Sequence, residues 1–409
     1  MGPAILLATS CRWYATARLA IAFRNAGCLV DVVCPSDHPT RFTRAVKRHF
    51  PYHGTRPLQS FQSAIDRSRP DLIVPCDDQA TKHLQHLHSS SKANETRELI
   101  EHSLGSPEAY PSFTARTRFL RRAAAAGIAV PETAELAGLA EMRAWLGGCG
   151  FPAYLKADAT SGGVGVKFVA DIEGAERAYR QLSSPISSLR MIKRVVINSD
   201  ASNVLPWLTR RRSVVSIQKV IRGVEANSAI ACWRGRLLAC LSAEVLQRRN
   251  TTGPATVLRF VDNEQMRSAA EKVASTFHLT GLFGLDYIIE EETGVPYLIE
   301  FNGRATQTCH LNFGEGRNPV DALAAAITGT SAVAASPISC ETVALFPQEW
   351  KRDPASKFLR SAYHDVPWEE PELVRECMKR QLHEAEWLSY DRWLAFWGTA
   401  KPSRSSTMH

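Results

Sequence analysis

Short apolar runs alternate with stretches of helical periodicity along the first hundred residues. Runs at 4–9, 28–35 and 70–78 have the length of buried strands. A stretch of helical periodicity, 18–27, lies between the first two runs, and another, 79–88, follows the third. Strands that alternate with helices predict a parallel sheet with helices packed on it. No Gly-x-Gly-x-x-Gly sequence follows the first strand, which argues against a dinucleotide site there.

A second unit is predicted to begin near residue 111. An Ala-rich segment, 112–127, has the pattern of one helix. Two segments, 151–169 and 213–233, then read as strand, glycine turn and strand. The stretch from about 336 carries five of the nine tryptophans and predicts a small appended sub-domain.

A further helix is predicted over 261–281. Asp262 is its expected N-cap, and Gln265 three residues later would complete a capping box.

The segment 281–304 predicts a β-hairpin whose turn contains Gly294. A three-residue loop ending at Gly294 would place Asp286 opposite Glu300, with their Cβ atoms about 5 Å apart. Two facing carboxylates repel unless a divalent cation lies between them, and Asn302 adds an oxygen on the same face. Such oxygen ligands suit Mg²⁺, especially with phosphate. A four-residue loop would put the two acids on opposite faces, and a solvated edge strand is the alternative.

The segment 156–166 is rich in glycine. The backbone N–H groups around Gly162, Gly163 and Gly165 can close on a phosphate, and Lys156 adds a cation. No Gly-Lys-Ser/Thr opens a helix here, so the segment is not a Walker A loop. Glycine-rich turns are common, and this pattern alone is weak.

Composition limits the classes of function. The 409 residues, 44% of them hydrophobic, predict roughly two to four sub-domains. No apolar run is long enough to span a bilayer, and the N-terminal run lacks the basic residues of a signal peptide. We therefore expect no membrane partner, a cytoplasmic location and reduced thiols for the ten scattered cysteines. The formal charge of +8 is spread along the chain, so a nucleic-acid partner is unlikely and small anions are favoured.

These motifs occur together and in a characteristic order. Lys156, the glycine flap, the strand at 217–221 and a downstream Asp…Glu-x-Asn-x-Arg set resemble the ATP-grasp superfamily of carboxylate–amine ligases over roughly residues 1–330. The resemblance implies an α/β fold with an N-terminal parallel-sheet domain, a two-lobed domain that clamps ATP between sheets and a small C-terminal sub-domain. The expected boundaries are 1–110, 111–212 (the lobe with the flap), 213–335 (the lobe with the metal site) and 336–409.

The resemblance also implies roles for single residues. Lys156 would contact the α- and β-phosphates, Gln218 the adenine amino group and Glu225 the ribose hydroxyls. Arg304 would stabilise the phosphoryl group in transfer, and with Lys156 it forms the expected catalytic pair. The residues implied to bind ATP are Arg116, Lys156, Ser161, Gly162, Gly163, Val164, Gly165, Gln218, Lys219, Val220, Ile221 and Glu225. Asp286, Glu300 and Asn302 would hold two Mg²⁺ ions, for which Mn²⁺ can substitute.

The chain departs from the family pattern at one position. Family members usually carry a second lysine on the helix before the turn that ends in Pro131. This chain has Arg116 at the expected distance, and Arg118 is the rival. Arginine also pairs with phosphate, so ATP binding is still expected.

Acceptor-site residues are predicted from the loop 246–260 and from the end of the metal strand. Arg248, Arg249 and Arg259 can grip a carboxylate or phosphate, and His310 can touch the substrate; a solvated loop and a structural histidine are the alternatives. Asp77 and Asp78 follow a first-domain strand, where they either meet a ligand or cap a helix.

The expected activity is an ADP-forming ligase that joins a small carboxylate and an amine through an acyl phosphate, for example in making a dipeptide. The alternatives are a carboxylating subunit like biotin carboxylase or carbamoyl-phosphate synthetase, and a non-catalytic ATP-binding regulatory module. The partners are thus small molecules, and since relatives often dimerise through the first domain, a homodimer is a further expectation.

Overall fold

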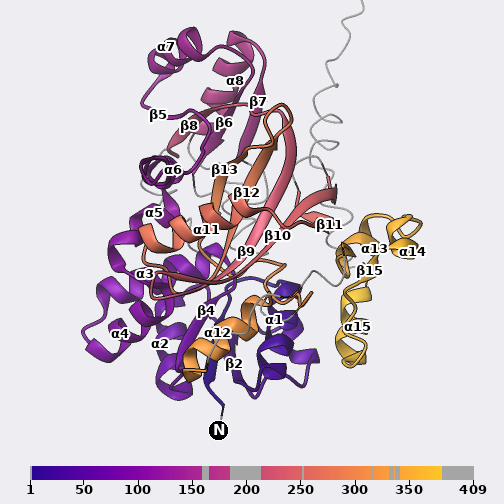
Figure 1. The fold of residues 1–409 in the computed structure, drawn as a ribbon. Coiled ribbons are helices and arrows are strands. Elements are labelled where there is room, and N and C mark those ends of the chain that lie inside the picture. The colour runs from indigo at the N-terminus through magenta and orange to yellow at the C-terminus, as the bar shows by residue number, and fades with distance from the viewer. Residues whose placement is uncertain are drawn as a thin grey trace, which may run out of the picture.

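A computed structural model describes residues 2–158, 165–184, 213–250, 253–314, 317–330, 336 and 341–379. Three sheets organise this part of the chain (Figure 1). The long strands of the largest sheet extend from the N-terminal domain toward a smaller lobe, and the C-terminal helices lie to one side. This mixed α/β architecture agrees with the predicted fold class.

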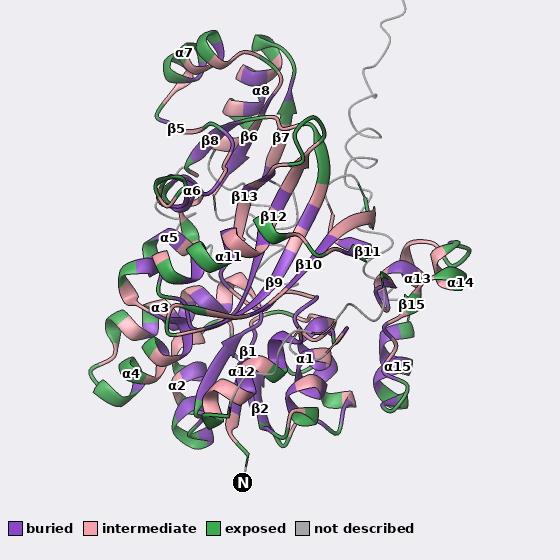
Figure 2. Cartoon of the chain, in the orientation of Figure 1, coloured by how far each residue is buried: buried purple, intermediate pink, exposed green. Residues whose placement is uncertain are grey.

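The N-terminal domain is a parallel sheet in the order β3-β2-β1-β4, as the alternating pattern predicts. Its strands are β1 (Ala4–Ala8), β2 (Leu29–Cys34), β3 (Arg48–Pro51) and β4 (Leu72–Pro75). Helices cover both faces, so the central strands are buried (Figure 2). The helices are α1 (Tyr14–Asn25), η1 (Pro39–Phe42), α2 (Pro57–Ser68), α3 (Asp78–Ser90) and α4 (Asn94–Leu104).

The predicted single helix 112–127 is wrong, because the chain forms two helices there. A short turn, η2 (Pro107–Ala109), leads into α5 (Tyr110–Thr114), and α6 (Arg116–Ala125) follows. Ala115 between them is extended, with φ −106° and ψ 95°. The break makes Arg116 the first residue of α6.

A four-stranded antiparallel sheet in the order β5-β8-β6-β7 forms the smaller lobe. Its strands are β5 (Thr133–Leu136), β6 (Ala153–Ala157), β7 (Val166–Val169) and β8 (Val215–Lys219). Leu155 and Ile217 are register partners and pack under α7 (Leu139–Cys149) and α8 (Ile172–Ser183) in one core. Strand β8 therefore belongs to this lobe, although the strand after it does not.

The largest sheet has the order β13-β12-β9-β10-β11-β14-β15. Its long strands are β9 (Gly223–Trp233), β10 (Arg236–Arg248), β11 (Ala255–Phe260), β12 (Gly281–Glu290) and β13 (Pro296–Asn302). Helices α11 (Glu264–Thr276) and α12 (Pro319–Thr328) pack on it. The N-cap prediction for α11 is wrong: Asn263 accepts the Met266 N–H at 3.0 Å, and Asp262 instead pairs with Arg317 at 2.8 Å.

The C-terminal segment, residues 341–379, joins the largest sheet to the N-terminal domain. It contains β14 (Thr342–Ala344), α13 (Gln348–Arg352), α14 (Phe358–Ser361), β15 (Tyr363–His364) and α15 (Pro371–Met378). Strand β14 pairs with β11, and buried carboxylates of the segment meet arginines of the N-terminal domain. The ion pairs are Arg12–Glu376, Arg18–Asp365, Arg24–Glu370 and Arg44–Glu370.

Across the part of the chain that the structure describes, each helix is too short or too polar to cross a bilayer.

Candidate functional site

The β12–β13 hairpin brings Asp286 and Glu300 face to face, as register partners. The predicted three-residue loop is wrong. The Glu290 N–H donates to the Val295 carbonyl at 2.9 Å, which closes a four-residue loop, and Gly294 takes the expected left-handed conformation with φ +72°. A four-residue loop alone would have put the two acids on opposite faces.

A β-bulge on β13 restores the alignment. Tyr287 pairs with Leu298, but the residue before it in β12, Asp286, pairs with Glu300. Ile299 is therefore the extra residue on β13. The two carboxylates therefore share a face through a combination of loop and bulge that side-chain alternation alone does not reveal.

The facing acids interact through charge and hydrogen bonds. Burial and the neighbouring Glu300 raise the pKa of Asp286 to about 6, while the Asn302 amide donates to Asp286 Oδ2 at 3.0 Å and partly offsets this. Burial alone would raise the pKa of Glu300, but Arg116 and Lys156 hold it below its usual value. This site has one carboxylate whose charge is compensated and one that is not, which suits a bound cation.

Arg116 bridges the hairpin and the smaller lobe. Its Nη2 lies 2.8 Å from Glu300 Oε1, and its Nη1 lies 3.8 Å from Asp158 Oδ1. The Nε and Nη1 atoms of Arg116 are buried without a hydrogen-bond partner among the described residues. Arg118 is exposed on the same helix. The geometry thus brings Arg116, and not its rival, to the acids.

Asp158 is a site residue that the sequence analysis missed. It follows Lys156 by two positions, the spacing that places strand residues on one face, and this was the available signal. Burial raises its pKa to about 6, against the opposing effect of Arg116.

Lys156 and Gln218 touch each other, although separate roles are predicted for them. Lys156 Nζ donates to Gln218 Oε1 at 2.6 Å, and Gln218 Nε2 donates to Thr133 Oγ1 at 3.1 Å. Lys156 is 6% exposed, and burial together with the Arg116 charge lowers its pKa to about 8. A buried ammonium with a neutral partner is well suited to receive an anion.

The predicted adenine segment crosses from one sheet to another. Lys219 ends β8 in the smaller lobe, Val220 and Ile221 follow it, and β9 of the largest sheet begins at Gly223. The Lys219 N–H already donates to the Glu132 carbonyl at 2.9 Å. Of the Lys219 backbone, only the carbonyl oxygen is then left to meet a base.

Arg304 lies at the boundary between the largest sheet and the N-terminal domain. Its Nε donates to Asp78 Oδ1 at 3.0 Å, and its Nη2 donates to Asn302 Oδ1 at 3.3 Å. Asp77 is the N-cap of α3 and accepts the Ala80 N–H at 2.8 Å. The two acids therefore have different roles. Asp77 caps a helix, whereas Asp78 faces the site.

The predicted substrate loop 246–260 is largely strand. Arg248 ends β10 and pairs with Glu225, the expected ribose ligand. Arg259 lies within β11, opposite its ion-pair partner Glu244 on β10. Arg249 lies in the short turn between the strands, where its N–H donates to the Pro254 carbonyl.

The His310 side chain is 6% exposed and contacts the C-terminal segment. Its Nε2 lies 2.7 Å from Asp365 Oδ2, and Asp365 also pairs with Arg18. These contacts place His310 at the junction with the C-terminal segment. The sequence analysis predicts that it touches the substrate.

The glycine flap falls mostly outside the described residues. Ser161, Gly162, Gly163 and Val164 belong to that part of the chain. Gly165 is described, and its carbonyl accepts the Ala157 N–H at 2.9 Å where the second strand begins.

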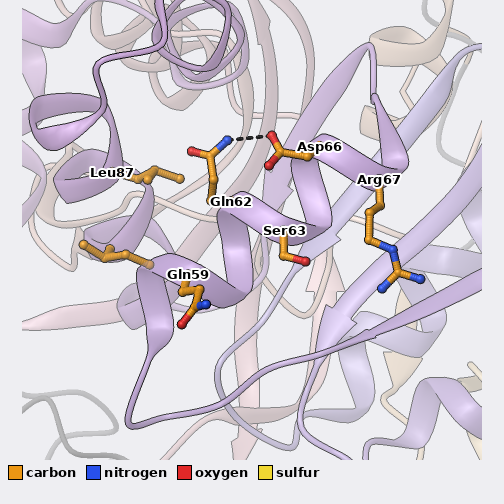
Figure 3. A pocket seen from close by; sticks show the side chains of 7 residues that line it. Gln59, Gln62, Ser63, Asp66, Arg67 and Leu87 are labelled. Atoms are coloured by element: carbon orange, nitrogen blue, oxygen red, sulfur yellow. Dashed lines mark hydrogen bonds between the residues drawn. The ribbon is translucent and has the colours of Figure 1, made fainter.

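A surface hollow of about 480 Å³ lies elsewhere, between α2 and α3 (Figure 3). A hydrogen bond of 2.7 Å from Gln62 to Asp66 crosses its wall. None of the predicted site residues lines the hollow, so it is not part of the candidate site. Its lining residues are Leu58, Gln59, Gln62, Ser63, Asp66, Arg67 and Leu87.

Comparisons with known proteins found a family model and several solved structures that resemble the chain. The family model of the ATP-grasp domain matches residues 156–308. N5-carboxyaminoimidazole synthetase from Staphylococcus aureus, complexed with ADP, is 12% identical with a TM-score of 0.60, over 83% of this chain and 81% of that chain. N5-carboxyaminoimidazole synthase from Aspergillus clavatus, in complex with ADP and 5-aminoimidazole ribonucleotide, is 15% identical with a TM-score of 0.60, over 82% and 79%.

A third solved structure has the same fold. It is the biotin carboxylase domain dimer of Hydrogenobacter thermophilus 2-oxoglutarate carboxylase, in complex with MgADP, ADP and bicarbonate. It is 16% identical with a TM-score of 0.58, over 82% of this chain and 72% of that chain. None of the curated protein sequences compared with this chain matches it. Residues 156–308 thus match the ATP-grasp domain that the motifs predict, and the solved structures share the fold of this chain.

The residues present fit ATP and Mg²⁺. Two buried nitrogens of Arg116 that have no hydrogen-bond partner among the described residues, and the buried ammonium of Lys156, suit phosphate oxygens. The Asp286, Glu300 and Asn302 oxygens suit a hard cation. In the described ranges no cluster of three or more His, Cys, Asp or Glu side chains can hold a metal. The predicted set has only two such residues beside an amide.

Proposed function

We propose that the chain is an ATP-dependent, ADP-forming ligase that joins a small carboxylate to an amine. One observation carries the proposal. Two carboxylates, Asp286 and Glu300, face each other near the charge of Lys156, and Glu300 also contacts Arg116. Burying these acidic and basic side chains costs free energy. A magnesium–triphosphate complex would compensate the acids through its cation and the basic groups through its phosphates.

In the proposed reaction, an oxygen of the substrate carboxylate attacks the γ-phosphorus of ATP. The bond to the bridging oxygen breaks, ADP leaves and an acyl phosphate forms. The amine then attacks the acyl carbon, loses a proton and displaces inorganic phosphate, which leaves an amide. Each step needs positioning and charge compensation, and no covalent enzyme intermediate.

The chain's own residues would hold and orient the reactants. Lys156 and Arg116 would bind phosphate oxygens, and Arg304 would stabilise the phosphoryl group as it moves. Gln218 and the 219–221 backbone would bind adenine. Asp286, Glu300 and Asn302 would hold Mg²⁺, which draws negative charge from the phosphates; two ions, and exchange for Mn²⁺, are part of the proposal.

A carboxylating reaction is the second candidate. Two of the solved structures above are N5-carboxyaminoimidazole synthetases, and the third is a biotin carboxylase domain that holds bicarbonate. Bicarbonate would then take the place of the substrate carboxylate, and carboxyphosphate that of the acyl phosphate. The same side chains would serve, so the substrate alone separates the two candidates.

The test is phosphate release from MgATP with a panel of amino acids, singly and in pairs, and with bicarbonate plus amines. We expect release to need one particular combination and to vanish in Glu300→Ala. Glu290→Ala is the matched control, since Glu290 lies on the same hairpin and its carboxylate accepts a hydrogen bond from the turn residue Thr293. If MgATP binds and no combination stimulates release, a non-catalytic ATP-binding module replaces the ligase. If MgATP does not bind, both fail.

A further inference from the structure

The corner between β4 and α3, residues 75–81, forms hydrogen bonds with the loop that carries Arg304. The Ala305 N–H donates to the Pro75 carbonyl at 2.9 Å. On the other side of Arg304, the Thr81 hydroxyl donates to the Gly303 carbonyl, also at 2.9 Å, and this contact is buried. The N-terminal domain therefore fixes the backbone on both sides of the arginine.

Asp78 of the same corner holds the Arg304 side chain. Asp78 Oδ1 accepts from Arg304 Nε at 3.0 Å. Arg304 Nη1 donates to the Ala305 carbonyl and Nη2 to Asn302 Oδ1, both at 3.3 Å. A guanidinium carries five N–H groups, so each terminal nitrogen keeps one for another acceptor. The guanidinium plane is thus oriented beside the metal strand while part of its donor capacity stays available.

The adjacent acid, Asp77, does not orient the Arg304 side chain. Asp77 accepts from Thr9 Oγ1, Ser10 N and Ser10 Oγ at 2.6–2.8 Å, besides capping α3. Each Asp77 carboxylate oxygen therefore accepts two hydrogen bonds, which hold the loop after β1 and the start of α3. Asp78 is the first residue of α3, and its side chain pairs with Arg304. The sequence Asp77–Asp78 therefore combines a structural acid with one that faces the site.

We infer that Asp78 is a positioning residue that aims Arg304 at the transferring phosphoryl group. The inference rests on the proposed function and adds a consequence to it. Phosphoryl transfer depends on how the N-terminal domain is seated, because the carboxylate that orients the arginine comes from that domain. Outer partners of metal ligands typically change activity by about 10- to 100-fold when removed, and we expect an effect of that order for the partner of Arg304.

The test uses MgADP with aluminium fluoride, which together mimic the phosphoryl group in transfer, on the full chain. In the wild type we expect aluminium fluoride to tighten MgADP binding, measured by calorimetry. Asp78→Asn keeps the shape of the side chain and removes its charge. It should leave the Kd for MgADP alone within about twofold and reduce the tightening about tenfold or more. Asp78→Glu should restore part of the tightening, which a merely structural role does not predict.

The controls separate the possible failures. Asp66→Asn changes an exposed acid of α2 and should behave as the wild type. Arg304→Lys should lose the tightening, and adding Asp78→Asn to it should cause little further loss, since both act through one group. If Asp78→Asn keeps the full tightening, the inference is overturned. If the wild type itself shows no tightening, phosphoryl transfer, and with it the proposed function, fails instead.

Discussion

Arg116 and Glu300 are 184 residues apart in the sequence, and Arg116 Nη2 lies 2.8 Å from Glu300 Oε1. The contact joins the start of α6 to β13, and the other terminal nitrogen of Arg116 faces Asp158 in the smaller lobe. Two lobes and one helix therefore converge on a single guanidinium. This convergence suits an arginine, because a guanidinium can reach several oxygens at once.

Replacing Arg116 should weaken MgATP binding. Hydrogen bonds to charged groups contribute roughly 1.5–3 kcal/mol each, so Arg116→Ala should raise the Kd by about 10- to 100-fold. The Kd of Arg116→Lys should lie between those of the wild type and Arg116→Ala, because lysine keeps the charge and loses the planar donor set. Calorimetric titration with MgATP measures this.

Arg118→Ala is the matched control on the same helix and should change the Kd by less than about twofold. A large effect of Arg118→Ala with none of Arg116→Ala would exchange their assignments.

Asp286→Asn should make the metal-free protein more stable. Burial and Glu300 raise the pKa of Asp286 to about 6, so its charged form carries a stability penalty that is fully present above pH 6 and absent below about pH 4. Removing that charge should add about 1–3 kcal/mol to the free energy of unfolding at pH 7 in EDTA. Urea unfolding checks this.

With MgADP present, the wild type should have the larger free energy of unfolding, because it gains stability by binding and the variant gains little. An Asp286→Asn protein that is less stable in EDTA would show that the acids do not repel.

His38 should make the N-terminal domain sensitive to acid. Its ring is buried, and burial followed by the Arg12, His49 and Arg41 charges lowers its pKa to about 3. Between pH 6.5 and about 3 the unfolded chain binds the extra proton, so the free energy of unfolding falls as pH falls, by up to roughly 1.4 kcal/mol per pH unit.

His38→Asn keeps an acceptor for the Thr40 N–H at the start of η1 and removes the titration. Its unfolding free energy should depend less on pH between 6.5 and 4 than that of the wild type. The exposed His86→Asn variant should follow the wild type, and equal pH slopes for all three proteins would contradict the prediction.

Asp365→Asn should destabilise the fold through the junction with the C-terminal segment. Asp365 is buried between His310 and Arg18, whose charges hold its pKa below its usual value in spite of burial. Removing one partner of a buried ion pair costs about 3 kcal/mol or more, since the Arg18 charge is left uncompensated.

Thermal and urea unfolding should show this loss, whereas Glu369→Gln, at an exposed acid of the same segment, should change stability by less than about 0.5 kcal/mol. Similar stability of both variants would mean that the junction tolerates the uncompensated arginine.

Much of the architecture follows from local pattern. The strands at 4–9, 28–35 and 70–78 contain β1, β2 and β4, because buried parallel strands are short apolar runs with sharp ends. The segments 48–51 and 57–68 were not predicted as β3 and α2. Strand β3 lies at the sheet edge and only Phe50 of its four residues is buried, so its sequence carries no apolar run.

The failures at element ends have local causes that pattern cannot rank. Asp262 and Asn263 are adjacent and both are good N-caps, so only the backbone decided for Asn263. The break at Ala115 interrupts a run of helix-forming residues and carries no sequence signal, yet it sets the position of Arg116.

The sequence by itself determined which groups are available: two carboxylates and an amide on one strand pair, a lysine near a glycine turn, and arginines in order along the chain. Those types and spacings depend on strand periodicity and charge chemistry, which are local. Only the tertiary structure decided which groups meet. The Ile299 bulge aligned the acids, the N-terminal domain placed Asp78 on Arg304, and the C-terminal segment enclosed His310. Contacts between distant segments depend on how whole sheets and helices pack, and no single stretch of sequence encodes that packing.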